Sequence, residues 1–194
     1  YAEAGGFWSS GPDVPAPDIQ YHFVPAMLED HGREAVKGHG FSCHACVLRP
    51  HSKGTVRLNN DDPQAPPAID PNFLDDDRDI ATLRKGVRHM KRILESPPLT
   101  EYAPTDRHPI DINNDAELDA LIRQRADTVY HPVGTCRMGG DDDAVVDARL
   151  KFRGLEGLYI ADASIMPEII SGNTNAPSIM IGERAAEFIK ADLG

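Results

Sequence analysis

The sequence predicts an α+β fold in which helices flank an antiparallel sheet, and three observations support this prediction. Residues 19–24 alternate apolar and polar side chains, which is the pattern of a half-buried strand. Residues 41–48 and 55–58 are rich in strand-forming residues on either side of a turn at 49–54, so they predict an antiparallel hairpin. Residues 77–95 place apolar side chains three and four positions apart, which predicts an amphipathic helix.

The other segments complete this prediction. Residues 1–18 are rich in Gly, Pro and Ser and predict an irregular lead-in, and residues 59–71, with four prolines, predict a loop. Residues 115–125 predict a second amphipathic helix. Residues 158–161 predict a short apolar strand, and residues 177–191 predict a helix that has a proline in its first turn.

A change of composition near residue 125 divides the chain into two parts. Residues 1–125 contain the predicted sheet and the two amphipathic helices. Residues 126–194 are dense in Gly and apolar residues and predict a loop–strand–loop–helix unit. The first part is therefore expected to be a sheet domain, and the second a smaller subdomain.

Composition and charge exclude several classes of protein. The 20 basic and 31 acidic residues give a formal net charge of −11, which disfavours nucleic acid and anionic lipid as partners. No apolar run approaches 18 residues, so no membrane-spanning helix is expected. The three cysteines are an odd number and favour a reducing compartment. A cytoplasmic protein is expected, and peripheral association with a membrane remains open.

The first residues do not resemble a targeting segment. Residues 1–6 contain neither a basic region nor an apolar region, so no signal peptide is expected there. The sequence begins with Tyr1 rather than Met, which favours its interpretation as part of a longer polypeptide.

Five segments, in a fixed order, resemble signatures of the glucose-methanol-choline family of flavin-dependent oxidoreductases. They are Leu48–Leu58, Asp62–Pro67, Val129–Gly139, Leu158–Pro167 and Gly172–Ala186. The resemblance covers nearly the whole chain and implies a substrate-domain sheet in the first part. It also implies that the second part returns to a partial FAD-binding subdomain.

The resemblance implies a catalytic pair, His131 and Asn175. An alcohol loses its hydroxyl proton as hydride leaves its carbon, and histidine is the side chain that exchanges protons near neutral pH. In this interpretation His131 accepts the proton and Asn175 holds the substrate oxygen. The alternatives are that His131 is a core histidine and that Asn175 is a helix cap.

FAD is the cofactor that the resemblance implies. Asp162 and Ala163 are expected to contact it near its ribityl and phosphate groups. The residues around the start of the last helix are expected to face the flavin ring, and they are Asn173, Thr174, Asn175, Ala176 and Pro177. The sequence has no G-x-G-x-x-G after a strand, so the missing N-terminal FAD-binding portion of the same polypeptide is an expected partner.

Three residues are expected to contact the substrate: Val129 and Tyr130, beside His131, and His44, on a predicted strand. Cys43 and Cys46 also raise the possibility of zinc. Positions 43 and 46 of one strand point to opposite faces, and no second C-x-x-C completes a site, so no metal is expected.

The resulting prediction is the C-terminal part of an FAD-dependent enzyme that oxidises a primary alcohol to an aldehyde by hydride transfer to the flavin N5 atom. Choline and aliphatic alcohols both remain open as substrates, and so does the electron acceptor. Two alternatives are a flavin-containing lyase that cleaves cyanohydrins on the same fold and a non-catalytic interaction domain. Retention of both His131 and Asn175 argues against the interaction domain.

Overall fold

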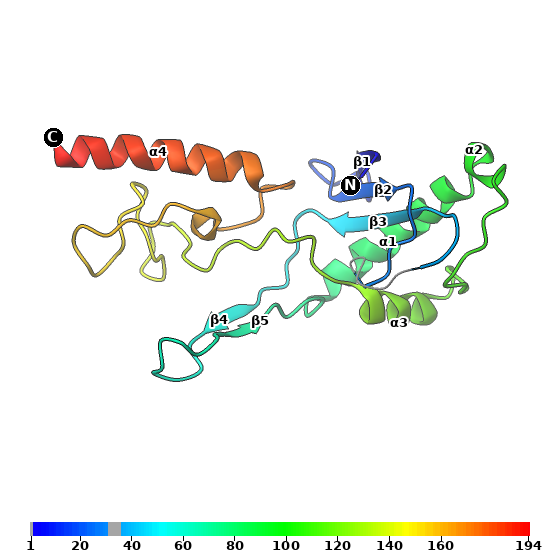
Figure 1. Ribbon diagram of the computed structural model, residues 1–194, viewed down its shortest axis with the longest axis horizontal. Helices are drawn as coiled ribbons and strands as arrows, with labels where there is room; N and C mark the ends of the chain where they lie inside the picture. The colour runs from blue at the N-terminus through cyan, green and yellow to red at the C-terminus, as the bar shows by residue number, and fades with distance from the viewer. Residues whose placement is uncertain (1, 31–35) are drawn as a thin grey trace. The chain divides into compact units, whose positions relative to one another are not determined.

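The computed structural model describes residues 2–30 and 36–194, and the chain forms two compact units (Figure 1). Unit 1 comprises Tyr1–Ser52 and Phe73–Asp127. Unit 2 comprises Lys53–Asn72 and Thr128–Gly194. Residues 53–72 therefore already belong to unit 2. The chain then returns to unit 1 at residue 73 and enters unit 2 again at residue 128.

Unit 1 is built on a three-stranded antiparallel sheet. Its strands are β1 (Ala4–Trp8), β2 (Ile19–Val24) and β3 (Ser42–Val47), in the order β1-β2-β3. On the central strand, the fully buried Ile19 pairs with Trp8 on one side and Val47 on the other. Burial alternates with the sequence over Ile19–His22, and the expected strand is confirmed.

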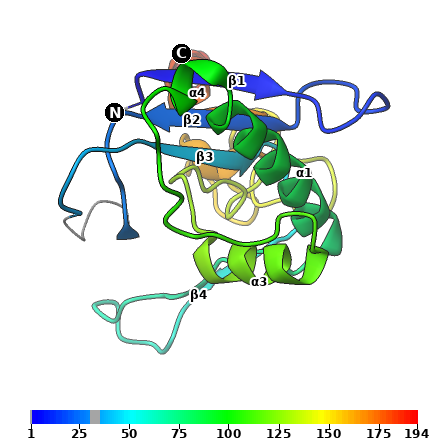
Figure 2. The same ribbon diagram turned by 90° about the vertical axis from the view of Figure 1, so that its right-hand side faces the viewer.

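Helix α1 (Asp77–Leu94) covers one face of this sheet, as Figure 2 shows. Gly86 allows the close approach, because a Cβ atom there would lie 3.0 Å from the Ile19 side chain. The Tyr21 hydroxyl donates to the Gly86 carbonyl over 3.2 Å, and burial raises the pKa of Tyr21 to about 12. The indole of Trp8 stacks on His89 at 4.3 Å between ring centroids, which adds a third contact between helix and sheet.

The remaining helices of unit 1 are the one-turn α2 (Pro97–Thr100) and α3 (Asp115–Arg125). The side chain of Asn114 caps α3 by accepting from the first-turn N–H groups. Ile80 of α1 and Leu118 and Ile122 of α3 form a buried cluster. Both long helices have the bounds that the sequence predicts to within one residue, so these predictions are confirmed.

Two strand predictions in this region are wrong. Part of the expected irregular lead-in forms β1, which gains its hydrogen bonds from β2 despite its two glycines. The expected hairpin between residues 41–48 and 55–58 does not form, since β3 pairs with β2 instead. The cause lies in the expected turn, where the backbone N–H groups of His51 and Ser52 both donate to the buried carboxylate of Asp79 over 2.8 Å. These bonds hold the chain against the start of α1.

Unit 2 contains few regular elements. They are β4 (Thr55–Arg57), which pairs with β5 (Ala68–Asp70), the 3-10 turn η2 (Ala163–Ile165) and α4 (Asn175–Leu193). β5 lies in the segment expected to be loop, and it supplies the partner that β4 was expected to find in β3. Figure 1 shows α4, in red, beside the yellow and orange loops of the same unit.

The expected strand at residues 158–161 is reduced to a single bridge. Tyr159 pairs with Lys151, and Phe152 N–H and Ile160 N–H donate to Leu158 and Leu150 carbonyls, respectively. The prediction of a strand is wrong because only one residue pair has strand geometry. The last helix begins at Asn175, two residues before the expected start.

A compact hydrophobic core holds unit 2 together. Its buried members come from the 146–150 loop, from the end of η2 with the residue after it, and from α4, and they are Val146, Leu150, Ile165, Met166, Ile181 and Ala185. Residues 53–72 belong to this unit, although the sequence assigns them to the first part of the chain. The composition of this short Pro-rich segment does not specify which unit it packs with. The boundary between the last residue of unit 1 and the final segment of unit 2 lies at 127/128, close to the expected boundary near residue 125.

The α+β class is confirmed by these elements.

Among the described helices, none combines the length and hydrophobicity needed to span a bilayer. Within residues 2–30 and 36–194, no three His, Cys, Asp or Glu side chains are grouped as a metal site.

Replacing Asp79 with alanine is expected to destabilise unit 1. The carboxylate, 3% exposed, also accepts from the Ser52 hydroxyl at 2.5 Å, so its loss leaves three donors without their acceptor. We expect Asp79→Ala to lower the free energy of unfolding by about 2–3 kcal/mol, measured by urea denaturation followed by circular dichroism. The control is Asp77→Ala in the same helical turn, where the side chain is exposed and a smaller loss is expected. Equal losses in the two variants would contradict the role of Asp79.

Candidate active site

The segment that carries His131 is fixed to the core of unit 2. Just after it, Cys136 N–H donates to the Ser164 carbonyl over 3.0 Å, and Met138 N–H donates to the Ile165 carbonyl over 2.8 Å. Val133 and Met138 pack against the buried cluster. The polypeptide on the C-terminal side of His131 is thereby tied to η2.

The start of α4 is fixed to the same core. Ile181 and Ala185, one turn apart, are the buried positions of this helix. Because one core holds both α4 and the segment after His131, residues 43 positions apart in the sequence meet at the helix start.

The imidazole of His131 is held between two side chains. Its Nδ1 atom lies 2.8 Å from Oγ1 of Thr174, and its Nε2 atom lies 2.7 Å from Nδ2 of Asn173. The backbone N–H of Thr174 also points to Nδ1, over a longer 3.5 Å. Thr174 is buried, whereas Asn173 is exposed, so the ring has one enclosed nitrogen and one nitrogen on the open side.

Two residues beside this cluster have a strained backbone. Tyr130 has φ 64° and Ser171 has φ 66°, both in the left-handed region that residues with a Cβ atom adopt at a cost of about 1–2 kcal/mol. Tyr130 N–H donates to Thr128 Oγ1 over 2.9 Å, which supports the turn. Such strain concentrates at functional sites, where surrounding structure maintains it.

Asn175 is the first residue of α4 rather than its cap, so the alternative interpretation of Asn175 as a helix cap is wrong. Thr174 occupies the cap position, and its side chain makes no capping hydrogen bond. The first helical bond runs from Ser178 N–H to the Thr174 carbonyl. Asn175 and Ala176 are exposed, and the structure gives Asn175 no side-chain hydrogen bond within the described residues. Pro177 follows as the third helical residue.

Asp162 and Ala163 lie at η2 in the same unit. The Asp162 carboxylate accepts from Ser164 N–H over 2.8 Å and so caps the 3-10 turn, while the residue itself is exposed. Ala163 packs against the core cluster. The structure thus gives Asp162 a local turn role through one of its oxygens.

Of the expected substrate contacts, Val129 and Tyr130 come directly before His131 in the sequence and are 39% and 62% exposed. His44 belongs to unit 1, on β3, where it lies opposite His22 of β2. Because Ile19 and Tyr21 face α1, strand alternation places both histidines on the other face of the sheet.

Cys43 and Cys46 are free thiols in the structure. Burial raises the pKa of Cys43 to about 11, and it raises the pKa of Cys46 as well. Thiols with raised pKa values are poor metal ligands and poor nucleophiles. Strand alternation also points the two side chains to opposite faces of β3, as the sequence predicts.

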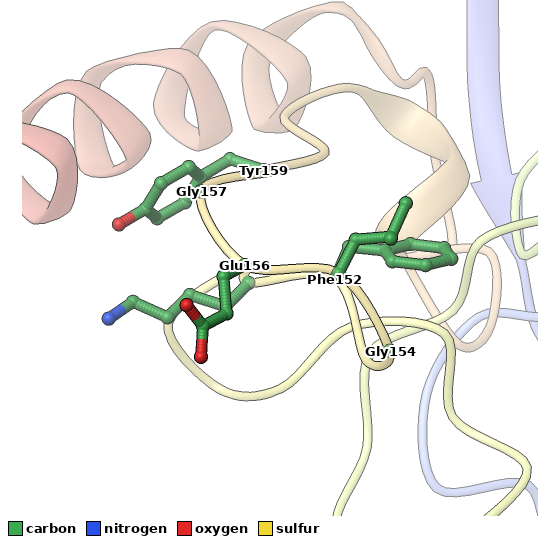
Figure 3. Close-up of a pocket in the computed structure, with 7 residues that line it drawn as sticks. Phe152, Gly154, Glu156, Gly157 and Tyr159 are labelled. Carbon is green, nitrogen blue, oxygen red and sulfur yellow. The ribbon is translucent and has the colours of Figure 1, made fainter.

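The described residues also form a surface depression away from His131, which Figure 3 shows. It is lined by residues of the 151–159 loop, including Phe152, Glu156 and Tyr159. Tyr159 donates to Asp192, which also pairs with Lys151 at 2.8 Å, so the polar groups here tie the loop to α4. None of the expected site residues lines this depression.

Sequence reasoning missed the side-chain partners of His131. It grouped Asn173 and Thr174 with the expected cofactor contacts and did not foresee that both would also lie against His131. No local pattern in a sequence reports the long-range partner of a threonine hydroxyl.

Comparisons with known proteins identify the family of this chain. The sequence model of the C-terminal region of GMC oxidoreductases matches residues 50–182. This range includes His131 and all of the residues expected at the start of α4.

Curated relatives have similar sequences across nearly the whole chain. An alcohol dehydrogenase [acceptor] of Pseudomonas putida is 46% identical over 97% of this chain and 34% of its own length. An oxygen-dependent choline dehydrogenase of Klebsiella pneumoniae subsp. pneumoniae is 47% identical with the same coverage. The chain thus spans about a third of the length of these relatives.

The fold is also similar to that of a solved flavoprotein. A formate oxidase variant of Aspergillus oryzae, studied for its FAD modification, superposes with a TM-score of 0.82 at 29% identity. The superposition covers 92% of this chain and 32% of the oxidase.

Replacing Gly134 with alanine is expected to disturb the loop that follows His131. Gly134 has φ 90°, where a Cβ atom is unfavourable by about 1–2 kcal/mol, so we expect a loss of stability of that size. The measurement is urea denaturation, and the control is Gly140→Ala, since φ is not in the left-handed region there and an added Cβ meets nothing within 4 Å. If Gly134→Ala unfolds at the same urea concentration as Gly140→Ala, the positive φ of Gly134 does not limit which residues this loop accepts.

Proposed function

The chain belongs to the GMC oxidoreductase family, and on this basis we propose that it forms the substrate-side and catalytic part of an FAD-dependent enzyme that oxidises a primary alcohol to an aldehyde. The names of the relatives, an alcohol dehydrogenase and a choline dehydrogenase, support this substrate class. Choline and aliphatic alcohols are the two candidate substrates.

One observation carries the proposal: the way in which His131 is held. Its Nδ1 atom is engaged by the buried Thr174, and its Nε2 atom lies on the side of the exposed Asn173 amide. An alcohol hydroxyl that takes the place of this amide hydrogen bond would lie within reach of Nε2. His131 is then the group that accepts the hydroxyl proton.

The reaction divides into a proton and a hydride. The O–H bond of the alcohol gives its proton to His131 Nε2, and the C–H bond of the same carbon gives its hydrogen with the electron pair, leaving an aldehyde. FAD, when bound, supplies the acceptor of that hydride at its N5 atom. Val129 and Tyr130, exposed beside His131, are proposed to contact the carbon chain of the substrate.

The start of α4 fits the cofactor that the family uses. The Thr174 side chain does not cap the helix, and Asn175 and Ala176 lie before its first hydrogen bond, so their N–H groups have no partner within the helix. Such an end carries positive partial charge and accepts an electron-rich group. We propose that Asn173–Pro177 contact the flavin ring and that Asp162 and Ala163 contact the rest of the cofactor. Asn175 would also face the substrate oxygen.

The portion of the polypeptide that binds the ADP half of FAD is proposed to lie outside this chain. The chain spans about a third of its curated relatives, and it contains no glycine-rich phosphate loop. This portion, together with the alcohol, is the partner that the chain is proposed to bind.

Replacing His131 with alanine in the full-length enzyme tests the proposal directly. Loss of a positioned proton acceptor is expected to lower kcat by roughly 10²–10⁴-fold. Flavin content, measured by absorbance, is expected to stay near that of the unmodified enzyme because most cofactor contacts lie elsewhere. Near-normal turnover by His131→Ala would overturn the assignment. A flavin spectrum that alcohol never bleaches, even in the unmodified enzyme, would instead favour the lyase.

Replacing Asn175 with aspartate tests its proposed position beside the flavin. A carboxylate there would oppose the arrival of hydride, so we expect Asn175→Asp to reduce its flavin roughly 10²-fold more slowly in stopped-flow experiments. The melting temperature should hardly change, because Asn175 does not cap α4 and the helix start tolerates negative charge. Asn175→Ala, which adds no charge, serves as the control, and its flavin reduction rate should fall less than that of Asn175→Asp. If Asn175→Asp reduces its flavin at the normal rate, Asn175 does not face the cofactor.

A further inference from the structure

The hydroxyl of Thr174 is not used in the way expected for its position. A threonine that precedes a helix usually accepts a hydrogen bond from the N–H of the second or third helical residue. The third residue of α4 is Pro177, which has no N–H, and Thr174 makes no capping bond. Its Oγ1 instead lies 2.8 Å from Nδ1 of His131, and the residue is 9% exposed.

The other side of the ring indicates which nitrogen carries the proton. A neutral imidazole has one N–H donor and one lone-pair acceptor. The group beside Nε2, at 2.7 Å, is the amide nitrogen of Asn173, which can only donate. With the amide in this orientation Nε2 presents its lone pair, and the proton of a neutral His131 is then on Nδ1, facing Thr174.

The backbone N–H of Thr174 would favour the other tautomer, because it also points toward Nδ1 and would need a lone pair on that atom. That contact is 3.5 Å long, beyond the usual range of such bonds, whereas the hydroxyl contact is of normal length. A hydroxyl can donate or accept, so the short contact fits the tautomer that the Asn173 amide selects, and in that tautomer Oγ1 accepts the proton of Nδ1.

We propose that Thr174 is a positioning residue that fixes the tautomer and orientation of His131, so that the lone pair of Nε2 faces the alcohol. This inference rests on the proposed function of His131 as proton acceptor. When Nε2 takes the proton, Nδ1–H keeps the same bond to Thr174, so neither side chain has to rearrange. Such a bond on one ring nitrogen sets the chemistry of the other.

The test compares Thr174→Val with Thr174→Ser in the full-length holoenzyme. Valine keeps the shape of threonine and removes the acceptor, so flavin reduction at saturating alcohol should slow by about 10–100-fold, by analogy with metal-bound histidines that lose the hydrogen-bond partner of their other ring nitrogen. KM should change little, because Thr174 is not proposed to contact the alcohol. Serine restores the oxygen and should recover most of the rate. If Thr174 had only a structural role, Thr174→Val and Thr174→Ser would not differ in this way in their flavin reduction rates.

The matched control is Ser178→Ala. Ser178 Oγ donates to the Thr174 carbonyl over 2.6 Å in the same helical turn, without touching His131. Its loss should leave the reduction rate within about twofold, as expected for a substitution away from the reacting groups. If Thr174→Val does not retain flavin, Thr174→Ala replaces it, with the same loss expected relative to Thr174→Ser.

The outcomes separate the two proposals. If His131→Ala loses activity but Thr174→Val reduces flavin as fast as Thr174→Ser, the positioning role is wrong and the proposed function stands. If His131→Ala remains active, the proposed function fails whatever the threonine variants do. Equal slowing of Thr174→Val and Ser178→Ala would show that the helix start matters rather than the hydroxyl, and would overturn the inference.

Discussion

The geometry of the candidate site depends on the hydrophobic core of unit 2. Few regular elements surround it, and burial of apolar side chains is what fixes the loops to α4. Ile165 holds η2, and through η2 the segment after His131, while Ile181 and Ala185 hold the helix. The relation of His131 to Thr174 is therefore set by packing several residues away from either side chain.

The start of α4 shows how local stability and chemistry compete. Pro177 favours a helical backbone but removes a donor that a threonine cap would use. Thr174 is thereby released to bond His131, and the end of the helix keeps its positive partial charge uncovered. A better-capped helix would be more stable and would present neither feature.

The sequence predicts the long elements of this fold well and the short ones poorly. Helices α1 and α3 were found because periodicity over many residues and terminal acidic or amide residues all indicate the same structure. β1 and the partner of β4 were missed because pairing partners of three- to five-residue strands are chosen by tertiary contacts. The expected turn after β3 was overridden by a single distant carboxylate, that of Asp79.

The sequence likewise predicts some features of the candidate site and not others. Family resemblance indicated His131 and the residues at the start of α4, and the structure brings these segments together. It did not indicate that Asn173 and Thr174, rather than Asn175, contact the ring, because side-chain partners depend on where the helix begins. A difference of two residues in that start changed which residue occupies the cap position.

Residues 53–72 leave unit 1 and complete unit 2 before the chain returns to build α1. On the ribosome this segment emerges long before Thr128–Gly194, the remainder of its unit, has been synthesised. Its β4-β5 ribbon has two strands of three residues, too small to be stable alone, so we expect it to become ordered only together with the rest of unit 2. Unit 2 is assembled from distant parts of the chain, and we expect its formation to be the slower, non-local step of folding.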